Sequence, residues 1–419
     1  MKAGLVDQPK FFENYVADRF KTHLGMLPQF RALEASEADK HWVRTKRSEA
    51  KCRSVQHWRG ELLRPQGRSM SRASARRIVR FIFHVNISFR FGQEAPAPDA
   101  TGPTHDKVHP RIGVTAKWIW TIYLGLTITE IILLVAGGMN FFDSVCHSLT
   151  TTATGGYSTK QNSIAAFNSP YIEYIITLFM FLAGINFTLL YLLFLKGNFK
   201  RLFQNTELHW YLGTVGFFTL FTTVTLIFTS PFSIEESFRK AIFQVVSLQT
   251  TTGFISADYM TWVPVLWTLM CIIMLFGACA GSTTGGIKCI RIAIMSRVSK
   301  NEFKHIIHPN AILPVRINRQ VISSTTKSAV LAFIFLYMAI IFIGWLVLML
   351  FGVGFEEAYS VVISSLGNVG PGIGKCGPSY SWNGLPDAAK WISAILMLIG
   401  RLELFTVLLL FMPSFWKKH

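Results

Sequence analysis

Charged residues are scarce in this chain. Of its 419 residues only 15% are charged, while 51% are hydrophobic and 35 are phenylalanine, whereas a soluble protein carries about 25% charged residues. This balance argues against a chain of ordinary soluble domains. The charge that is present is mostly basic, at 41 lysines and arginines against 23 acidic residues. A nucleic-acid-binding protein would gather that excess on one face, but here it is divided among separate segments, so we expect no nucleic-acid partner.

Paired cysteines are also missing. The cysteines are Cys52, Cys146, Cys271, Cys279, Cys289 and Cys376. None belongs to a CxxC pair, which argues against a zinc site and against a disulfide framework. Residues 1–20 contain charges throughout and no apolar core, so they lack the pattern of a secretory signal peptide. We expect no cofactor and no resident metal.

Long apolar runs, by contrast, are frequent. Six stretches approach or exceed the length of about 20 residues that a helix needs to cross a bilayer. They are residues 118–137, 172–195, 211–229, 263–287, 328–352 and 391–412. Because lipid offers no partners to polar backbone groups, each is expected to be a helix, with the fourth broken near its end by GACAGSTTGG (277–286). The sequence therefore predicts an all-α polytopic membrane protein.

The segments between these runs alternate in charge. Residues 196–210 and 288–327 are rich in lysine and arginine. Residues 138–171, 230–262 and 353–390 together carry seven acidic residues against five basic ones. In membrane proteins the basic loops face the cytoplasm. We therefore expect a multi-pass protein with both termini in the cytoplasm and the three non-basic links facing outward.

The three outward links share one pattern. Aligned on a glycine, they read FDSVCHSLTTTATG (142–155), KAIFQVVSLQTTTG (240–253) and EAYSVVISSLGNVG (357–370). Each has a mostly apolar half long enough for a short helix, followed by a small polar run that ends in glycine. Since each lies between two apolar runs, a unit of span, half-helix, glycine turn and span repeats about every 100 residues. The predicted domains are three such repeats, at 106–200, 201–300 and 301–419.

Residues 1–105 do not belong to this repeat. They contain 19 lysines and arginines against 10 acidic residues, and no run that could span a bilayer. We expect a basic segment without a defined fold. The alternative is a surface anchor for anionic lipids.

The glycine turns carry the functional prediction. Irregular backbone at membrane depth is tolerated where it is buried in protein or lines water. Glycine lets the backbone turn its carbonyls inward, and carbonyl oxygens can replace the hydration shell of a cation. The partly negative C-terminal end of a half-helix also favours a cation. Three such turns on one side of the membrane predict a shared ion path; the alternative is that the glycines serve close helix packing.

Several motifs carry a resemblance to a known family. In chain order they are SLTTTATGGYST, VVSLQTTTGFISADY, FGACAGSTTGGIKCIRI, HPNAILPV, SSLGNVGPGIG and GRLELFTVLLLF. From about Gly102 to the C-terminus the chain resembles the Trk/Ktr/HKT superfamily of potassium transporters, and within it the bacterial TrkH-type membrane subunits. The resemblance implies span–pore-loop–span repeats around one potassium path, of which this chain contains the family's second, third and fourth.

The resemblance also implies roles for individual residues. The selectivity filter would consist of Thr152, Ala153, Thr154 and Gly155, of Thr250, Thr251, Thr252 and Gly253, and of Gly367, Asn368, Val369 and Gly370. The gate beneath it would be Gly281, Ser282, Thr283, Thr284, Gly285 and Gly286. The alternative for this segment is a kink that serves packing. Arg401, in the last apolar run, would tune cation occupancy by repulsion, or else be a structural partner for Glu130, Glu403 or a helix end.

The function implied is potassium uptake across the cell (inner) membrane through a glycine-backbone filter with an intramembrane gate. Potassium would be the substrate, without covalent chemistry. The resemblance implies a homodimer in the lipid bilayer and a cytoplasmic nucleotide-binding regulatory subunit, with residues 288–327 as its docking surface. A membrane-embedded enzyme is the alternative of another class, but the spans offer only Glu130, Ser282, Arg401 and Glu403, with no spacing that indicates catalysis.

The chain departs from the family on its N-terminal side. About 100 residues before Gly155 it reads KCRSVQHWRGELL (51–63), with no apolar half-helix and no flanking span. The family has its first filter strand at this place. The alternative function is therefore a truncated or frame-disrupted, nonfunctional transporter remnant, and a further alternative is a pore that another chain completes.

Overall fold

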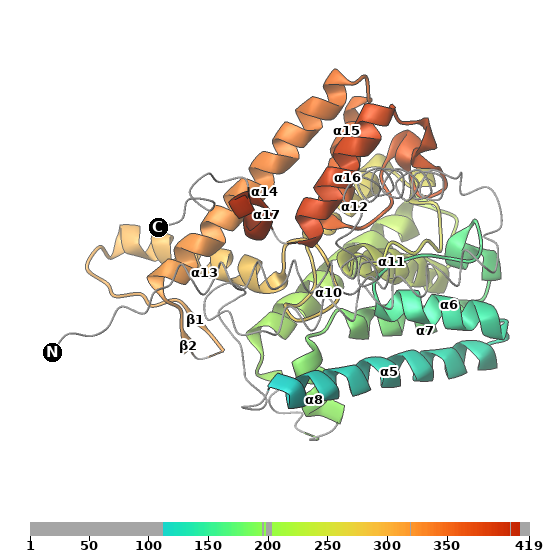
Figure 1. Cartoon of the computed structure of the whole chain (residues 1–419), viewed down its shortest axis with the longest axis horizontal. Helices are drawn as coiled ribbons and strands as arrows, with labels where there is room; N and C mark the ends of the chain where they lie inside the picture. Colours follow the sequence, from blue (N-terminus) through green and yellow to red (C-terminus); the bar gives the residue numbers. More distant parts are fainter. Residues whose placement is uncertain (1–111, 195–196, 198–202, 319, 403, 411–419) are drawn as a thin grey trace, which may run out of the picture. The chain divides into compact units, whose positions relative to one another are not determined.

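The computed structural model describes residues 112–194, 197, 203–318, 320–402 and 404–410 (Figure 1). All of them belong to one compact unit, Gln66–His419, and the other unit, Met1–Pro65, lies outside the described residues. The predicted lack of a defined fold in residues 1–105 also falls outside the described residues.

One order of elements occurs three times in the described part of the chain. A long helix is followed by a short helix and then by two helices with a break between them (Figure 1). The first round is α5 (Ile112–Ala136), α6 (Phe141–Thr152), α7 (Pro170–Ala183) and α8 (Phe187–Phe194). The second is α10 (Thr206–Thr229), α11 (Ile234–Gln249), α12 (Pro264–Leu275) and α13 (Cys289–Ile307). The third is α14 (Ser324–Leu350), α15 (Phe355–Gly367), α16 (Asp387–Arg401) and α17 (Leu404–Leu410). The prediction of an all-α polytopic fold is confirmed.

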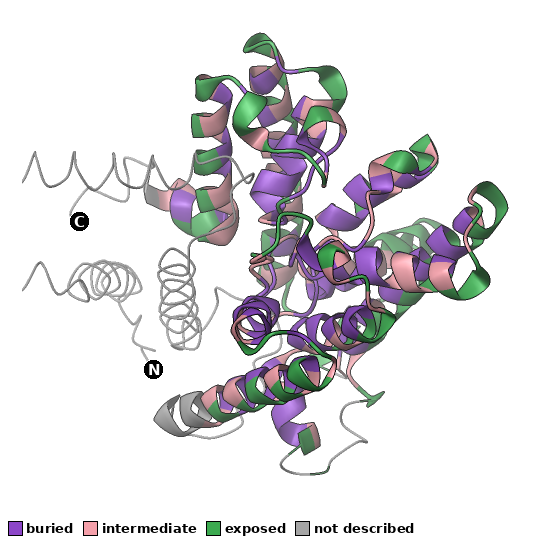
Figure 2. Cartoon of the chain, turned by 90° about the vertical axis from the view of Figure 1, so that its right-hand side faces the viewer, coloured by how far each residue is buried: buried purple, intermediate pink, exposed green. Residues whose placement is uncertain are grey.

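Three of these helices are long and apolar enough to cross a bilayer. They are Trp118–Ala136 within α5, Thr206–Thr229 and Ser324–Leu350. In each, 33% or less of the most apolar window is buried inside the protein (Figure 2). Soluble proteins rarely expose continuous apolar patches of that extent, so these faces suit contact with lipid.

The three short helices, α6, α11 and α15, are instead mostly buried; we call them the half-helices. Polar groups define where they begin. The Asn140 side chain accepts an N–H from the first turn of α6, and the Ser233 hydroxyl accepts the N–H of Glu236 in α11. Glu356 and Glu357 occupy the first turn of α15. Such acceptors and acidic groups complement the positive end of the helix dipole, so each start is determined by nearby sequence.

The prediction that five of the six apolar runs form unbroken helices is wrong for two of them. The second run is divided into α7 and α8, which are bent by 107°, and in the last run α16 ends at Arg401. At the first of these breaks the Gly184 carbonyl accepts the N–H of Cys279 at 3.1 Å. The Asn186 side chain accepts the N–H of Thr188 at 2.8 Å, so polar groups freed by the break find other partners. The fourth run is broken as predicted, with a loop at residues 276–288 after α12.

Shorter elements fill the links. Four 3₁₀ turns are η1 (Ser163–Phe167), η2 (Tyr259–Thr261), η3 (Gly374–Cys376) and η4 (Trp382–Gly384). A small antiparallel hairpin, which the sequence did not predict, consists of β1 (Arg316–Ile317) and β2 (Gln320–Val321), with Arg316 paired to Val321. Ile317 is fully buried in one cluster with Ile294 of α13, so the hairpin folds back against that helix.

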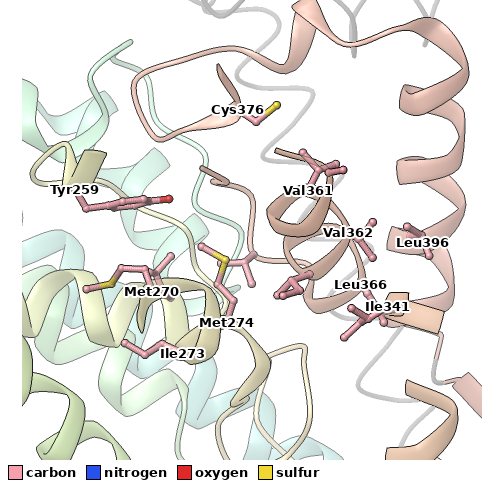
Figure 3. Close-up of a cluster of buried hydrophobic side chains, with 14 of the residues drawn as sticks. Tyr259, Met270, Ile273, Met274, Ile341, Val361, Val362, Leu366, Cys376 and Leu396 are labelled. Carbon is pink, nitrogen blue, oxygen red and sulfur yellow. The ribbon is translucent and has the colours of Figure 1, made fainter. Parts of the chain in front are cut away.

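Two large hydrophobic clusters meet at α11. Phe243 belongs to the cluster formed mainly by α5, α7 and α8, and Val245 to the one formed by α10, α12 and α14–α16. Figure 3 shows α15 between α12, which contributes Met270 and Met274, and α16, which contributes Leu396. Half-helices buried between these clusters hold the segments that follow them at fixed places.

Candidate functional site

The C-terminal ends of the three half-helices have the same backbone conformation. Thr154, Thr251 and Asn368 adopt left-handed φ angles of 52°, 54° and 56°, a region that residues other than glycine rarely enter. Each donates its N–H to the carbonyl three residues earlier. A strained angle at one equivalent place in three helices indicates a shared architectural requirement.

The next two residues establish how the three ends correspond. Gly155, Thr252 and Val369 each donate an N–H to the carbonyl five residues earlier, at 2.7, 2.9 and 2.9 Å. The residues that follow are Gly156, Gly253 and Gly370, all with positive φ, at 63°, 79° and 119°. The backbone equivalent of Gly253 and Gly370 is therefore Gly156, one residue beyond the glycine used in the sequence alignment.

Gly156 is the residue that sequence reasoning missed. The sequence offers one signal for it, since an aromatic residue follows both Gly156 and Gly253, namely Tyr157 and Phe254. We call residues 153–156, 250–253 and 367–370 the glycine bends.

The glycine bends lie in direct backbone contact with one another. A methyl group added at Gly156 would overlap the carbonyl oxygen of Thr252, and one added at Gly253 would overlap that of Val369. Only glycine allows so close an approach. At Gly370 an added methyl group would have no heavy atom of the described residues within 4 Å. The structure thus brings the three bends side by side, with open space at the last.

Most of the predicted filter residues are buried. Buried residues are Thr152, Ala153, Thr154, Thr250, Thr251, Thr252, Gly367 and Val369; Gly155, Gly253 and Asn368 are half-buried, and Gly370 is exposed. Their side chains carry no formal charge. Within one bend the hydroxyls of Thr250 and Thr252 lie 2.9 Å apart. The polar groups that the bends offer are therefore backbone amides, hydroxyls and one side-chain amide.

The loop at 276–288 contacts the ends of all three half-helices. The Thr283 hydroxyl donates to the Thr152 carbonyl at 3.3 Å, and the Thr283 carbonyl accepts from the Thr154 hydroxyl at 3.1 Å. Gly285 donates its N–H to the Thr251 hydroxyl at 2.8 Å, and a methyl group added there would overlap the Gly367 carbonyl oxygen. The residues predicted as a gate thus lie against the C-terminal ends of α6, α11 and α15.

Two ionisable side chains bind this loop on either side of Ser282. The Ala280 N–H donates to Glu207 Oε1 at 2.5 Å, and Lys288 Nζ donates to the Thr284 carbonyl. Between them the Ser282 hydroxyl donates to the Cys279 carbonyl at 2.6 Å and lies 2.8 Å from the Thr284 hydroxyl. In the described residues no hydrogen bond joins Ser282 to a histidine or a carboxylate. Gly281, at the tip, packs on the Asn186 side chain, and Gly286 has a left-handed φ of 66°.

Arg401, at the end of α16, contacts the same loop. Its Nη1 donates to the Thr283 carbonyl at 3.2 Å. No ion pair joins it to Glu130 among the described side chains, although Glu130 is fully buried in α5; Glu403 lies outside the described residues. The guanidinium group is therefore adjacent to the loop, on the side where the half-helices end.

Most of this chain is similar in sequence to known proteins. A family model described as a cation transport protein, TrkH, matches residues 101–418. The Trk system potassium uptake protein TrkH of Halomonas elongata is 38% identical over 318 residues, which cover 76% of this chain and 66% of that protein. The protein of the same name from Escherichia coli K12 is 34% identical over 329 residues, 78% of this chain and 68% of that one.

A solved structure shares the fold. The crystal structure of the potassium transporter TrkH from Vibrio parahaemolyticus aligns with a TM-score of 0.73 and 32% identity, over 81% of this chain and 74% of that chain. The chain spans about two thirds of the length of the curated relatives that it matches.

Proposed function

Since this chain belongs to the TrkH family of cation transport proteins, we propose that it conducts potassium ions across the cell (inner) membrane along a path lined by its three glycine bends. The observation that carries the proposal is the backbone contact between these bends, each at the C-terminal end of a buried half-helix. The relatives are named potassium uptake proteins, and this name supplies the identity of the ion.

The chemistry of the bends suits a monovalent cation. Oxygen dipoles can replace the water around such an ion without binding it too tightly to leave. The partly negative ends of the half-helices add to the attraction. We assign the filter to residues 152–155, 250–253 and 367–370, as the resemblance implies, and add Gly156 because its backbone conformation matches that of Gly253 and Gly370.

Residues 281–286 act in this proposal as the gate. Contacts of Thr283 and Gly285 with three half-helix ends support the assignment. Ion passage would require Thr283 to move away from the bends, since its hydrogen bonds join it to Thr152 and Thr154. Arg401 adds a positive charge beside Thr283, which lowers the occupancy of a cation there by repulsion.

The proposed assembly is a homodimer in the lipid bilayer, with both termini cytoplasmic and a cytoplasmic nucleotide-binding regulatory subunit docked on residues 288–327. The basic character of this link supports its cytoplasmic side. Within it, Lys300 and Lys304 are exposed near the end of α13, where they are accessible to a partner.

A glycine substitution tests the ion path. At Gly253 the φ angle of 79° and the nearby Val369 carbonyl both oppose a side chain. We expect Gly253→Ala to lower potassium uptake by at least about tenfold, equivalent to about 1.4 kcal/mol. Gly216→Ala, in α10 with no heavy atom within 4 Å of an added methyl group, is the matched control and should retain uptake. Rubidium tracer influx into cells that lack their own potassium uptake systems measures the effect.

The wild-type chain decides between this function and its alternative. Its amount in the membrane is determined in the same cells, so that failure to insert is not mistaken for failure to transport. An inserted chain that supports no more influx than empty vector would overturn the proposal and favour a nonfunctional remnant.

A further inference from the structure

Each half-helix holds either the last residue of its glycine bend or the segment that leaves the bend, through a polar side chain at one equivalent position. The residues are Thr150, Ser247 and Ser364, whose carbonyls accept the N–H five residues later. Ser247 Oγ donates to the Phe254 carbonyl at 2.7 Å, directly after Gly253. Thr150 Oγ1 lies 3.0 Å from the carbonyl oxygen of Tyr157, directly after Gly156. Ser364 Oγ accepts the N–H of Gly370 at 2.9 Å.

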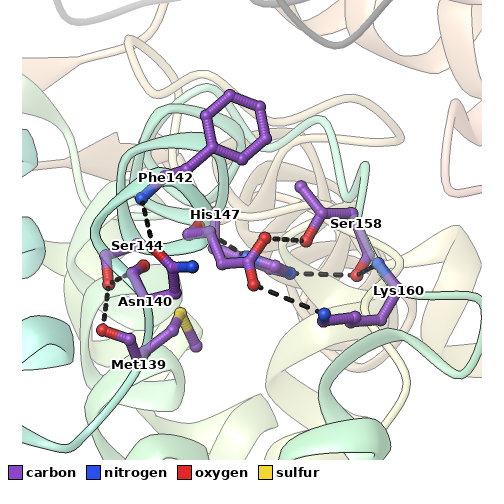
Figure 4. A network of polar contacts seen from close by, with 9 residues as sticks. Met139, Asn140, Phe142, Ser144, His147, Ser158 and Lys160 are labelled. Carbon is purple, nitrogen blue, oxygen red and sulfur yellow. Dashed lines mark hydrogen bonds and ion pairs between the residues drawn. The ribbon is translucent and has the colours of Figure 1, made fainter. Parts of the chain in front are cut away.

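A second set of side chains repeats this arrangement about one helical turn earlier. His147 Nε2 lies 2.9 Å from the hydroxyl of Ser158, a contact that a dashed line marks in Figure 4. Gln244 Nε2 donates to the Ala257 carbonyl at 3.0 Å, and Ser360 Oγ accepts the N–H of Ile373 at 2.9 Å. All three are buried. Different residue types thus bind the segment that follows the glycine bend in each of the three half-helices.

The segment after the first bend is held most extensively. His147 is itself oriented by its Nδ1, which lies 2.7 Å from the Asp143 carbonyl oxygen. The Asp143 carboxylate accepts the hydroxyl of Thr159 at 2.7 Å and pairs with Lys160 at 3.6 Å (Figure 4). Three successive residues, 158–160, are therefore fastened to one side of α6.

These contacts bear on ion selection. In the described part of the chain the residues directly after the bends form no β-ladder. Neighbouring segments are joined by isolated hydrogen bonds instead, such as the one from the Tyr259 hydroxyl to the Gly372 carbonyl at 2.6 Å. Discrimination between potassium and sodium depends on how far the ligand oxygens can approach the ion and on how freely they move. A bend that could shift inward would fit the smaller sodium ion.

We propose that His147, Thr150, Gln244, Ser247, Ser360 and Ser364 are positioning residues that hold the glycine bends at a spacing that favours potassium over sodium. The inference rests on the proposed function, because it concerns the selectivity of the same path. Ser247 gives the clearest test, since the one described bond of its hydroxyl is to the outgoing segment. The Thr150 hydroxyl has a single hydrogen, for which the carbonyls of Cys146 and His147 also compete.

The experiment compares buried serines whose hydroxyl has a hydrogen bond in the described residues with buried serines whose hydroxyl has none there. Ser247→Ala removes the bond, and Ser247→Thr restores a hydroxyl. Ser237→Ala, in the same half-helix, removes a buried hydroxyl that has no hydrogen-bond partner in the described residues. Ser364→Ala and Ser365→Ala form a second pair, because Ser365 is the adjacent buried hydroxyl without a described partner. Each purified protein is assayed for the ratio of rubidium to sodium influx in proteoliposomes, and for the difference in thermal midpoint between potassium and sodium chloride.

We expect Ser247→Ala and Ser364→Ala to lower the potassium preference by about fivefold, the factor that corresponds to one hydrogen bond of about 1 kcal/mol. Ser247→Thr should recover it, and Ser237→Ala and Ser365→Ala should not change it. A lower thermal midpoint with an unchanged ion ratio would show that the side chains serve stability alone and would overturn the inference.

The thermal measurement needs no transport. A wild-type chain whose thermal midpoint is higher in potassium chloride than in sodium chloride, but which conducts no potassium, therefore contradicts the proposed function only. A wild-type chain without any preference in either assay contradicts both.

Discussion

At the scale of single residues, Arg401 offers a direct test of the electrostatics beneath the bends. Its guanidinium group donates to the Thr283 carbonyl, so a cation that passes this loop meets a positive charge at close range. Arg401→Gln keeps an N–H that can reach the same carbonyl but removes the charge. We expect a several-fold rise in the initial rate of rubidium influx, because removing the like charge lowers the electrostatic cost of a cation beside Thr283.

Arg401→Lys is the matched control, since it keeps the charge and should leave the rate near that of the wild type. If Arg401→Gln and Arg401→Lys lowered influx equally, the shape and packing of the guanidinium group rather than its charge would matter, and the residue would be structural.

The assignment of Gly155 shows what the sequence could not predict for single residues, namely which of two adjacent glycines corresponds to Gly253. Composition and spacing identified a polar run that ends in glycine, but the run TATGG contains two adjacent glycines. Aligning the earlier glycine with Gly253 placed the first bend one residue out of register. The correspondence is determined by hydrogen bonds such as the one from the Gly155 N–H to the Thr150 carbonyl, and by the positive φ of Gly156. Residue types alone do not predict these backbone properties.

At the scale of elements, an ion pair joins α7 to α11 at their N-terminal ends. Arg239 Nη1 lies 2.5 Å from Glu173 Oε2, with side chains only 13% and 6% exposed. Removing one partner of such a pair leaves a buried charge and typically costs about 3–5 kcal/mol. We therefore expect Arg239→Ala to lower the thermal midpoint of the detergent-purified protein clearly.

The same arginine supplies its own control. Its Nε also pairs with Glu235 at 3.0 Å, but that carboxylate is 57% exposed, and an exposed pair contributes about 1 kcal/mol or less. Glu235→Ala should change the midpoint little. Equal shifts for Arg239→Ala and Glu235→Ala would mean that burial of the Glu173 pair does not stabilise the contact between the helices.

Breaks in the apolar runs set the limit of prediction for elements. Hydropathy identified all six runs because it measures composition, and GACAGSTTGG revealed one break because small polar residues interrupt the apolar pattern. The bend between α7 and α8 has no such signal, since LAGIN contains a single glycine and a single asparagine. It depends on a distant partner, the N–H of Cys279, that meets the Gly184 carbonyl only in the folded protein.

At the scale of the whole molecule, the repeat of span, half-helix, bend and broken span could be read from the sequence because three copies reinforced one another. Each copy alone would have been ambiguous between a pore segment and a packing contact. The closeness of the bends could not be read in the same way. It depends on glycines that allow a neighbouring carbonyl to approach: Gly156 lies against the Thr252 carbonyl, and Gly253 lies against the Val369 carbonyl. These contacts are determined by the packing of one repeat against the next and not by the sequence of a single repeat.

Charge distribution over the whole molecule leads to a prediction about assembly. Lys300 and Lys304 are exposed at the end of α13, next to the exposed apolar side chains of Phe303, Ile306 and Ile307. A surface of this composition can attract an acidic partner over a Debye length of about 10 Å and then bury apolar area. We expect Lys300→Gln combined with Lys304→Gln to weaken binding of the proposed cytoplasmic nucleotide-binding subunit by about tenfold at low salt. Lys375→Gln, on a link predicted to face outward, should leave binding unchanged.

Titration of the labelled subunit against detergent-purified chain at two ionic strengths measures both the affinity and its dependence on salt. Because screening weakens attraction between exposed charges, the difference between wild type and double variant should shrink at high salt, and an association equally tight in both variants and insensitive to salt would place the docking surface elsewhere.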